Sequence, residues 1–174
     1  MITTLDYIIK KRKLIKNLVF TNGCFDLFHR GHLEIIKECI RHKNDKALSD
    51  YSYPFYYDKL DGKLVIAINT DESVKKLKEN NRPIISYDDR AEIINNIKGV
   101  DYVIPIEDES VFSIIESIRP DIIIKGNTTE KIIGEDFVKS YGGKVIKTEN
   151  KIMFSNNKIL STTNIIDKIK LSIG

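Results

Sequence analysis

Two of the chain's three histidines, His29 and His32, lie three residues apart in the segment FTNGCFDLFHRGHL at 20–33. Gly31 stands between them, and an apolar run precedes the segment. Imidazoles at the start of a helix can donate hydrogen bonds to phosphoryl oxygens, and the helix dipole there favours anions. Phosphoryl transfer depends on such positioned groups more than on a covalent nucleophile. The pattern therefore predicts a phosphate-handling site.

Two other interpretations of the histidines have less support. A single histidine at a helix start is more often a cap or a packed side chain. A metal site would need further ligands, but no third histidine or cysteine lies nearby, and Cys24 and Cys39 lack metal-site spacing. The sequence also contains neither a P-loop nor a G-x-G-x-x-G dinucleotide motif. We expect no protein-bound metal, and we interpret both cysteines as reduced thiols.

The elements that must position this segment follow a regular alternation. Short, nearly continuous apolar runs are typical of parallel strands covered on both faces. Amphipathic stretches of helical period separate them. The predicted strands are 18–23, 64–69, 101–106, 121–126 and 143–148, and the predicted helices are 32–42, 71–78, 88–97, 110–118, 135–141 and 162–173.

This alternation predicts right-handed βαβ units and therefore an α/β fold with a doubly wound, Rossmann-like, five-stranded parallel sheet. The length of 174 residues fits a single domain over 1–174. A further helix is expected at 5–17, beside the sheet. Ligands of such sheets bind beyond the carboxyl ends of the strands, which is where the 20–33 segment lies.

Two connections are longer than the alternation requires. Residues 43–62 form an aromatic-rich insertion, which we expect to pack on the sheet edge or on a second copy. A substrate-covering loop is the alternative for that insertion. Residues 149–160 form the other connection, with a hairpin turn predicted at Asn156–Asn157.

Charge and hydropathy limit the classes of partner. The net charge of +3 is too small, and the lysines too dispersed, to indicate nucleic-acid binding. No apolar run approaches the length of about 20 residues that a membrane-spanning helix needs. The start of the chain does not resemble a signal peptide. We therefore expect a cytoplasmic protein that binds neither nucleic acid nor membrane.

The segment GCFDLFHRGH at 23–32 resembles the signature of the nucleotidyltransferase superfamily that carries the H-x-G-H motif and includes the cytidylyltransferases. STTNII at 161–166 resembles that superfamily's second signature, a hydroxyl-rich turn at the start of the last helix. The intervening text is similar to the heptose 1-phosphate adenylyltransferase domain. The segments that carry this similarity are NTDESVKKLKENNRPIISYDDR (69–90), DIIIKG (121–126) and IIGEDFVKSYGGKVI (132–146).

This resemblance implies transfer of a nucleoside monophosphate from a nucleoside triphosphate, expected to be ATP, to a sugar 1-phosphate, with release of pyrophosphate. It implies Mg²⁺ carried by the triphosphate, and we also expect a homodimer. The implied roles fall into three sets: His29, His32 and Lys78 are catalytic; Gly23, Cys24, Phe25, Gly31, Lys125, Gly126, Asn127, Ser161, Thr162 and Thr163 bind the nucleotide; Asp26, Arg82 and Arg90 bind the acceptor.

Some features leave alternatives open. Asn127 and Thr128 stand where the heptose enzymes usually have glycine and aspartate, and the 149–160 connection is longer than usual. A cytidylyltransferase acting on a polyol phosphate such as glycerol 3-phosphate is therefore a second hypothesis. An inactive nucleotide-binding or scaffolding protein is a third. For Arg90 the alternative to phosphate binding is an ion pair with Asp88, Asp89 or Glu92.

Overall fold

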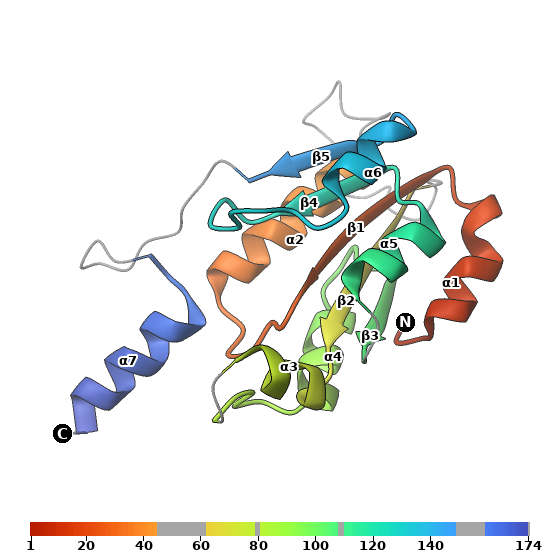
Figure 1. Ribbon diagram of the computed structural model, residues 1–174. Coiled ribbons are helices and arrows are strands. Elements are labelled where there is room, and N and C mark those ends of the chain that lie inside the picture. The colour runs from red at the N-terminus through yellow and green to blue at the C-terminus, as the bar shows by residue number, and fades with distance from the viewer. Residues whose placement is uncertain (45–61, 79–80, 108–109, 149–158, 174) are drawn as a thin grey trace.

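The computed structural model describes residues 1–44, 62–78, 81–107, 110–148 and 159–173. Five parallel strands form one sheet in the order β3-β2-β1-β4-β5, so that the strand order reverses between β1 and β4 (Figure 1). The predicted doubly wound α/β fold is therefore confirmed. The strands are β1 (Asn17–Gly23), β2 (Gly62–Asn69), β3 (Tyr102–Ile106), β4 (Ile122–Lys125) and β5 (Lys144–Lys147).

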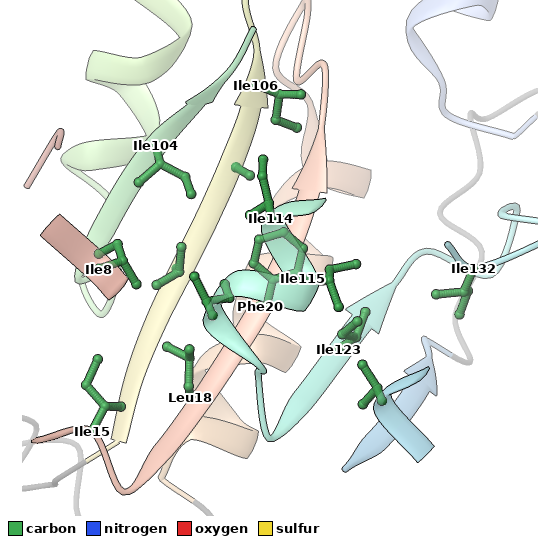
Figure 2. Close-up of a cluster of buried hydrophobic side chains, with 14 residues drawn as sticks. Ile8, Ile15, Leu18, Phe20, Ile104, Ile106, Ile114, Ile115, Ile123 and Ile132 are labelled. Atoms are coloured by element: carbon green, nitrogen blue, oxygen red, sulfur yellow. The ribbon is translucent and has the colours of Figure 1, made fainter. Parts of the chain in front are cut away.

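Helices cover both faces of the sheet because the strand side chains are apolar on both faces. On one face α1 and α5 pack in the same core cluster as Phe20 of β1, and Figure 2 shows Ile114 and Ile115 near Phe20 and Ile8 near Ile104 of β3. On the other face α2 and α4 pack through Ile36 and Ile94. The helices are α1 (Leu5–Lys11), α2 (Arg30–Lys43), α3 (Asp71–Leu77), α4 (Tyr87–Asn95), α5 (Val111–Ile118), α6 (Glu135–Ser140) and α7 (Thr162–Ile173).

The N-terminal helix is shorter than the predicted 5–17. After α1 ends at Lys11, the chain makes one 3₁₀ turn at Arg12–Leu14, and β1 begins at Asn17. The Arg12 guanidinium causes this end, because it donates hydrogen bonds to the carbonyls of Ile118 (2.7 Å) and Ile15 (2.9 Å). The tertiary contact to Ile118 and the local contact to Ile15 stabilise the chain where it leaves the helix.

Both ends of the predicted insertion lie in regular elements. Lys43 is the last residue of α2, and Gly62 is the first residue of β2. Residues 45–61 lie outside the described residues, and so does the turn predicted at Asn156–Asn157. Among the helices that the structure describes, none has the length and apolar character that crossing a membrane requires.

Candidate active site

A cavity of about 500 Å³ lies beyond the carboxyl ends of β1 and β4, where the strand order reverses. The starts of α2 and α7 close it. Fifteen of the predicted site residues line this cavity, and Arg90 does not: Gly23, Cys24, Phe25, Asp26, His29, Gly31, His32, Lys78, Arg82, Lys125, Gly126, Asn127, Ser161, Thr162 and Thr163. The topological switch point therefore gathers segments that are far apart in the sequence.

The two imidazoles form a stacked pair at the start of α2. Their ring centroids are 3.8 Å apart and the rings are inclined by 25°. His29 is the N-cap of α2, and its Nδ1 accepts a hydrogen bond from the Gly31 amide at 3.0 Å. The His32 Nδ1 accepts from the His29 amide at 3.4 Å. Because both Nδ1 atoms accept, each neutral ring carries its proton on Nε2.

Burial keeps both imidazoles uncharged. It lowers the pKa of His29, and burial together with the neighbouring His29 lowers the pKa of His32 to about 3. At neutral pH both rings are therefore neutral donors through Nε2. Such donors can stabilise charge on a phosphoryl oxygen without a proton-transfer step.

Gly31 is required by the close approach of the His29 ring. A Cβ at position 31 would lie 2.8 Å from His29 Cε1 and 2.9 Å from its Nδ1. The side chain of any other residue would therefore displace the ring that caps α2. The glycine of the H-x-G-H motif serves the packing of the two histidines.

The preceding loop holds Asp26 in the interior. Phe25 and Leu27, on either side of it, have φ values of 52° and 47°, which non-glycine residues seldom adopt. The Asp26 side chain is fully buried, and its Oδ2 accepts from Arg82 Nε at 2.5 Å. Asp26 was predicted to contact the acceptor, but its carboxylate is occupied by groups of the protein itself.

Arg90 is a structural residue, contrary to the prediction that it binds substrate. Its side chain is 1% exposed, and Nη2 pairs with Asp71 Oδ1 at 2.7 Å. Nη1 donates to the carbonyls of Cys24 (2.5 Å) and Asn69 (2.8 Å). The alternative partners Asp88, Asp89 and Glu92 were therefore also wrong. The guanidinium fastens the ends of β1 and β2 to α4.

Three cationic side chains line the cavity. Lys78 is the C-cap of α3, and its extended backbone ends the helix. Arg82 lies in the next described segment. Lys125, at the end of β4, donates from Nζ to the Asn22 carbonyl (2.6 Å) and to Asn22 Oδ1 (3.1 Å). Burial lowers the pKa of Lys125 to about 8. These cations suit a ligand that carries several phosphates.

The hydroxyl groups at the start of α7 do not all face a ligand. Ser161 Oγ accepts from the Asn164 amide at 3.2 Å, which leaves its own proton available. Thr162 Oγ1 donates to the Asp26 carbonyl at 2.6 Å. Thr163 is exposed at the cavity rim. Only Ser161 and Thr163 can therefore donate to a phosphate as predicted, and Thr162 instead ties α7 to the first loop.

The cavity also contains residues to which no role was assigned from the sequence. Most lie at strand ends and in loops, Ile35 and Asn164 lie in α2 and α7, and all carry hydroxyl, amide or branched aliphatic groups. The carboxyl-end position of Thr21, Asn22 and Thr148, and the place of Asn164 in the 161–166 motif, were the signals available. The additional lining residues are Thr21, Asn22, Ile35, Thr128, Thr129, Thr148, Ile159, Leu160 and Asn164.

The single cysteine of the cavity is not poised to act as a nucleophile. Cys24 Sγ lies 3.7 Å from Asn69 Oδ1, to which it donates. Burial raises the pKa of Cys24, so the thiol stays protonated at neutral pH. The arrangement therefore favours direct transfer between two bound substrates over a covalent intermediate on sulfur.

Together the switch-point cavity and the stacked histidines define a nucleotidyltransferase of the H-x-G-H class. A family model described as cytidylyltransferase-like matches residues 20–49 and 55–168. The chain belongs to the cytidylyltransferase-like family, and the class predicted from the motifs is confirmed.

Curated relatives show which proteins of the family the chain resembles. The chain is 36% identical over 166 residues to the bifunctional protein HldE of Syntrophotalea carbinolica, and 34% identical over 171 residues to that of Campylobacter fetus. These alignments cover 94% and 97% of this chain but 29% and 31% of the relatives. The chain thus spans less than a third of the length of the HldE proteins it matches.

Solved structures share the fold at low sequence identity. A lipopolysaccharide core biosynthesis protein from Thermoplasma volcanium superposes with a TM-score of 0.56 and 21% identity, covering 78% of this chain and 98% of that one. A pantoate-beta-alanine ligase from Francisella tularensis gives a TM-score of 0.59 at 14% identity, covering 95% and 72% of the two chains. At these identities the likeness concerns the fold alone.

Proposed function

We propose that the chain transfers the adenylyl group of ATP to a sugar 1-phosphate of the heptose type and releases pyrophosphate. The stacked, neutral pair of His29 and His32 in the switch-point cavity is the observation that carries this proposal. The segments that resemble the heptose 1-phosphate adenylyltransferase domain, and the identity to the HldE proteins, support the choice of substrates.

The reaction is a direct in-line displacement at the α-phosphorus. An oxygen of the acceptor phosphate attacks, the bond to the β-phosphate bridge oxygen breaks, and pyrophosphate leaves with that electron pair. The acceptor phosphate already carries negative charge, so it needs no general base. The Nε2–H groups of His29 and His32 bind the non-bridging oxygens of the α-phosphate as their charge increases.

The remaining groups divide between the two substrates. The hydroxyls of Ser161 and Thr163, with the first amides of α7, bind the β- and γ-phosphates. Lys78 neutralises charge on the reacting phosphates, and Arg82 binds the acceptor phosphate. Binding of both phosphates in one cavity holds the attacking oxygen near the α-phosphorus.

Mg²⁺ would be bound through the triphosphate oxygens. The cavity carboxylate, Asp26, is occupied by protein donors, and the described residues contain no cluster of three acidic, histidine or cysteine side chains that could hold a metal. The ion would neutralise phosphate charge when it is bound. The chain's own part is to orient the two phosphates.

The direct experiment measures pyrophosphate release by the purified chain with Mg²⁺ and each of the four ribonucleoside triphosphates. The acceptors are heptose and hexose 1-phosphates, with glycerol 3-phosphate as the polyol. ATP with a sugar 1-phosphate should give the highest kcat/KM. A preference of more than about tenfold for CTP, roughly 1.4 kcal/mol, would favour the polyol cytidylyltransferase. Absence of turnover with every pair would favour a nucleotide-binding scaffold.

The position to vary in this assay is Asn127, which lines the cavity where the heptose enzymes usually carry a glycine. The neighbouring Thr128 stands in the place of their aspartate, so the loop lacks a negative charge. If the loop contacts the base, Asn127→Asp should change the ratio of kcat/KM for ATP and CTP. An unchanged ratio would place base recognition elsewhere.

A further inference from the structure

Asp26 is hydrogen-bonded to two segments of the cavity wall that lie far from it in the sequence. Its Oδ1 and Oδ2 both accept from the Ile84 amide, at 3.1 and 3.0 Å, and Oδ1 also accepts from the Ile85 amide at 3.0 Å. Oδ2 takes the Arg82 Nε at 2.5 Å. One carboxylate thus fastens a segment that lies 56 to 59 positions away in the chain.

The main chain of the same residue holds a second distant segment. The Asp26 carbonyl oxygen accepts from Thr162 Oγ1 at 2.6 Å, across 136 positions. The α7 start that this bond holds is the one assigned above to the β- and γ-phosphates. Asp26 therefore touches the segments assigned to both substrates, although its own side chain is 0% exposed.

The charge of Asp26 is maintained in this burial. Burial alone would raise the pKa of Asp26, but the hydrogen bonds from Ile84, Ile85 and Arg82 outweigh it, and the pKa is lowered. The carboxylate is therefore ionised at neutral pH. Arg82 meets this carboxylate through Nε, so its two Nη groups remain on the other side of the guanidinium from Asp26.

We propose that Asp26 is a positioning residue that couples the two substrate subsites: its carboxylate aims the Nη groups of Arg82 at the acceptor phosphate, and its carbonyl fixes the α7 start on the triphosphate. This proposal rests on the function proposed above for the cavity. The unusual φ values of Phe25 and Leu27 fit it, because strained backbone is retained where the surrounding contacts determine it.

An ion pair of similar construction provides a matched control. Asp121 Oδ2 accepts from Arg12 Nη2 at 3.0 Å and from the Leu18 amide at 2.7 Å. It lies at the amino ends of β1 and β4, on the side of the sheet away from the cavity. Asp121→Asn should therefore lower stability without changing either KM.

The test compares wild type, Asp26→Asn, Arg82→Ala and the double variant in the pyrophosphate assay. Asparagine can still accept from the Ile84 and Ile85 amides, but it loses the charge that orients Arg82. Asp26→Asn should raise KM for the sugar 1-phosphate about tenfold, the size expected for one charge-assisted contact. KM for ATP should stay within twofold.

The double variant separates positioning from general destabilisation. If Asp26 acts through Arg82, adding Asp26→Asn to Arg82→Ala should change KM for the acceptor by less than about twofold, since coupled residues are not additive. The proposal would be overturned if the fold-changes of the two single variants in KM for the acceptor multiplied in the double variant. Equal rises of both KM values in Asp26→Asn would also overturn it.

The carbonyl contact is tested through Thr162. Thr162→Val removes the donor and should raise KM for ATP about tenfold while KM for the acceptor stays unchanged, and Thr162→Ser should restore the wild-type value. An effect of Thr162→Val on neither substrate, or failure of serine to restore it, would overturn this arm.

If no acceptor is turned over, binding of inorganic phosphate provides a second test of the proposal. Absence of turnover would reject the proposed function, whereas calorimetric binding of inorganic phosphate in the presence of Mg²⁺ and α,β-methylene-ATP would still test the positioning role of Asp26. Asp26→Asn and Arg82→Ala should each weaken the binding of phosphate about tenfold, and Asp121→Asn should not. Equal binding by wild type and Asp26→Asn would contradict the role of Asp26.

Discussion

The amino and carboxyl edges of the parallel sheet, where its strands begin and end, both contain buried ion pairs, and the cavity described above lies at the carboxyl edge. At the amino edge, Asp101 accepts from Lys43 Nζ and from the Leu64 amide, both at 2.8 Å. At the carboxyl edge, Asp26 accepts from Arg82 in the same manner. The amino-edge pair joins strands and helices to one another. In the carboxyl-edge pair the Arg82 side chain also lines the cavity, so an ion pair of the same kind positions a charged group for a ligand.

The difference follows from the direction of the strands. In a parallel sheet all carboxyl ends lie on one side, and the strand order reverses there between β1 and β4. The loops after β1 and β4 therefore diverge and leave room between them. At the amino edge, the carboxylates of Asp101 and Asp121 accept from the strand-start amides of Leu64 and Leu18.

The strongest test of this contrast is His32→Ala at the carboxyl edge. Removing one neutral donor to the α-phosphate should lower kcat about a hundredfold or more, because transition-state donors have effects of that size. The variant should unfold cooperatively, as the wild type does, in a urea titration. A folded His32→Ala variant with near-normal kcat would remove the histidine pair from the mechanism.

A weaker effect of another kind is expected at the amino edge. Lys43 is 4% exposed in its side chain and also donates to the Gly99 carbonyl at 2.7 Å. Lys43→Met should lower the free energy of unfolding by about 2 kcal/mol, because it leaves Asp101 and that carbonyl short of a donor. Pyrophosphate release should stay within twofold of wild type. A large loss of turnover in folded protein would erase the distinction between the edges.

The smallest expected effect concerns pH. The pKa of His32 is lowered to about 3 in the folded chain from 6.5, so the unfolded state takes up its proton first as the pH falls. Stability from this group is therefore complete above pH 6.5 and is lost progressively down to about pH 3. Between pH 7.5 and 5.5 the wild type should lose about 1.4 kcal/mol that His32→Gln does not lose. Equal losses in parallel urea titrations would show that His32 is not buried in its neutral form.

Much of the fold could be predicted because its strands are local features of the sequence. Buried parallel strands consist of nearly continuous Val and Ile runs, and all five appeared within two residues of their predicted starts. The end of α1 could not be predicted, because it depends on Arg12 meeting the carbonyls after α5.

The same limit separates the site residues whose positions could be predicted from those whose contacts could not. His29, His32 and the hydroxyls of 161–163 are contiguous in two motifs, so their gathering could be predicted from the strand-end rule. The true partners of Asp26 and Arg90 come from other segments, 56 and 19 positions away. Spacing along the chain does not specify such pairs, and both residues were therefore expected to face substrate when they in fact hold the cavity wall together.

Direct transfer between two phosphates held in the carboxyl-edge cavity would proceed without a nucleotidylated protein. It is tested by mixing stoichiometric wild-type protein with Mg²⁺ and ATP, following pyrophosphate and the intact protein mass, and then adding the sugar 1-phosphate. We predict no nucleotidylated protein and no burst of pyrophosphate before the acceptor, followed by steady release after it. A stoichiometric burst with a nucleotidylated chain in the absence of acceptor would contradict direct displacement.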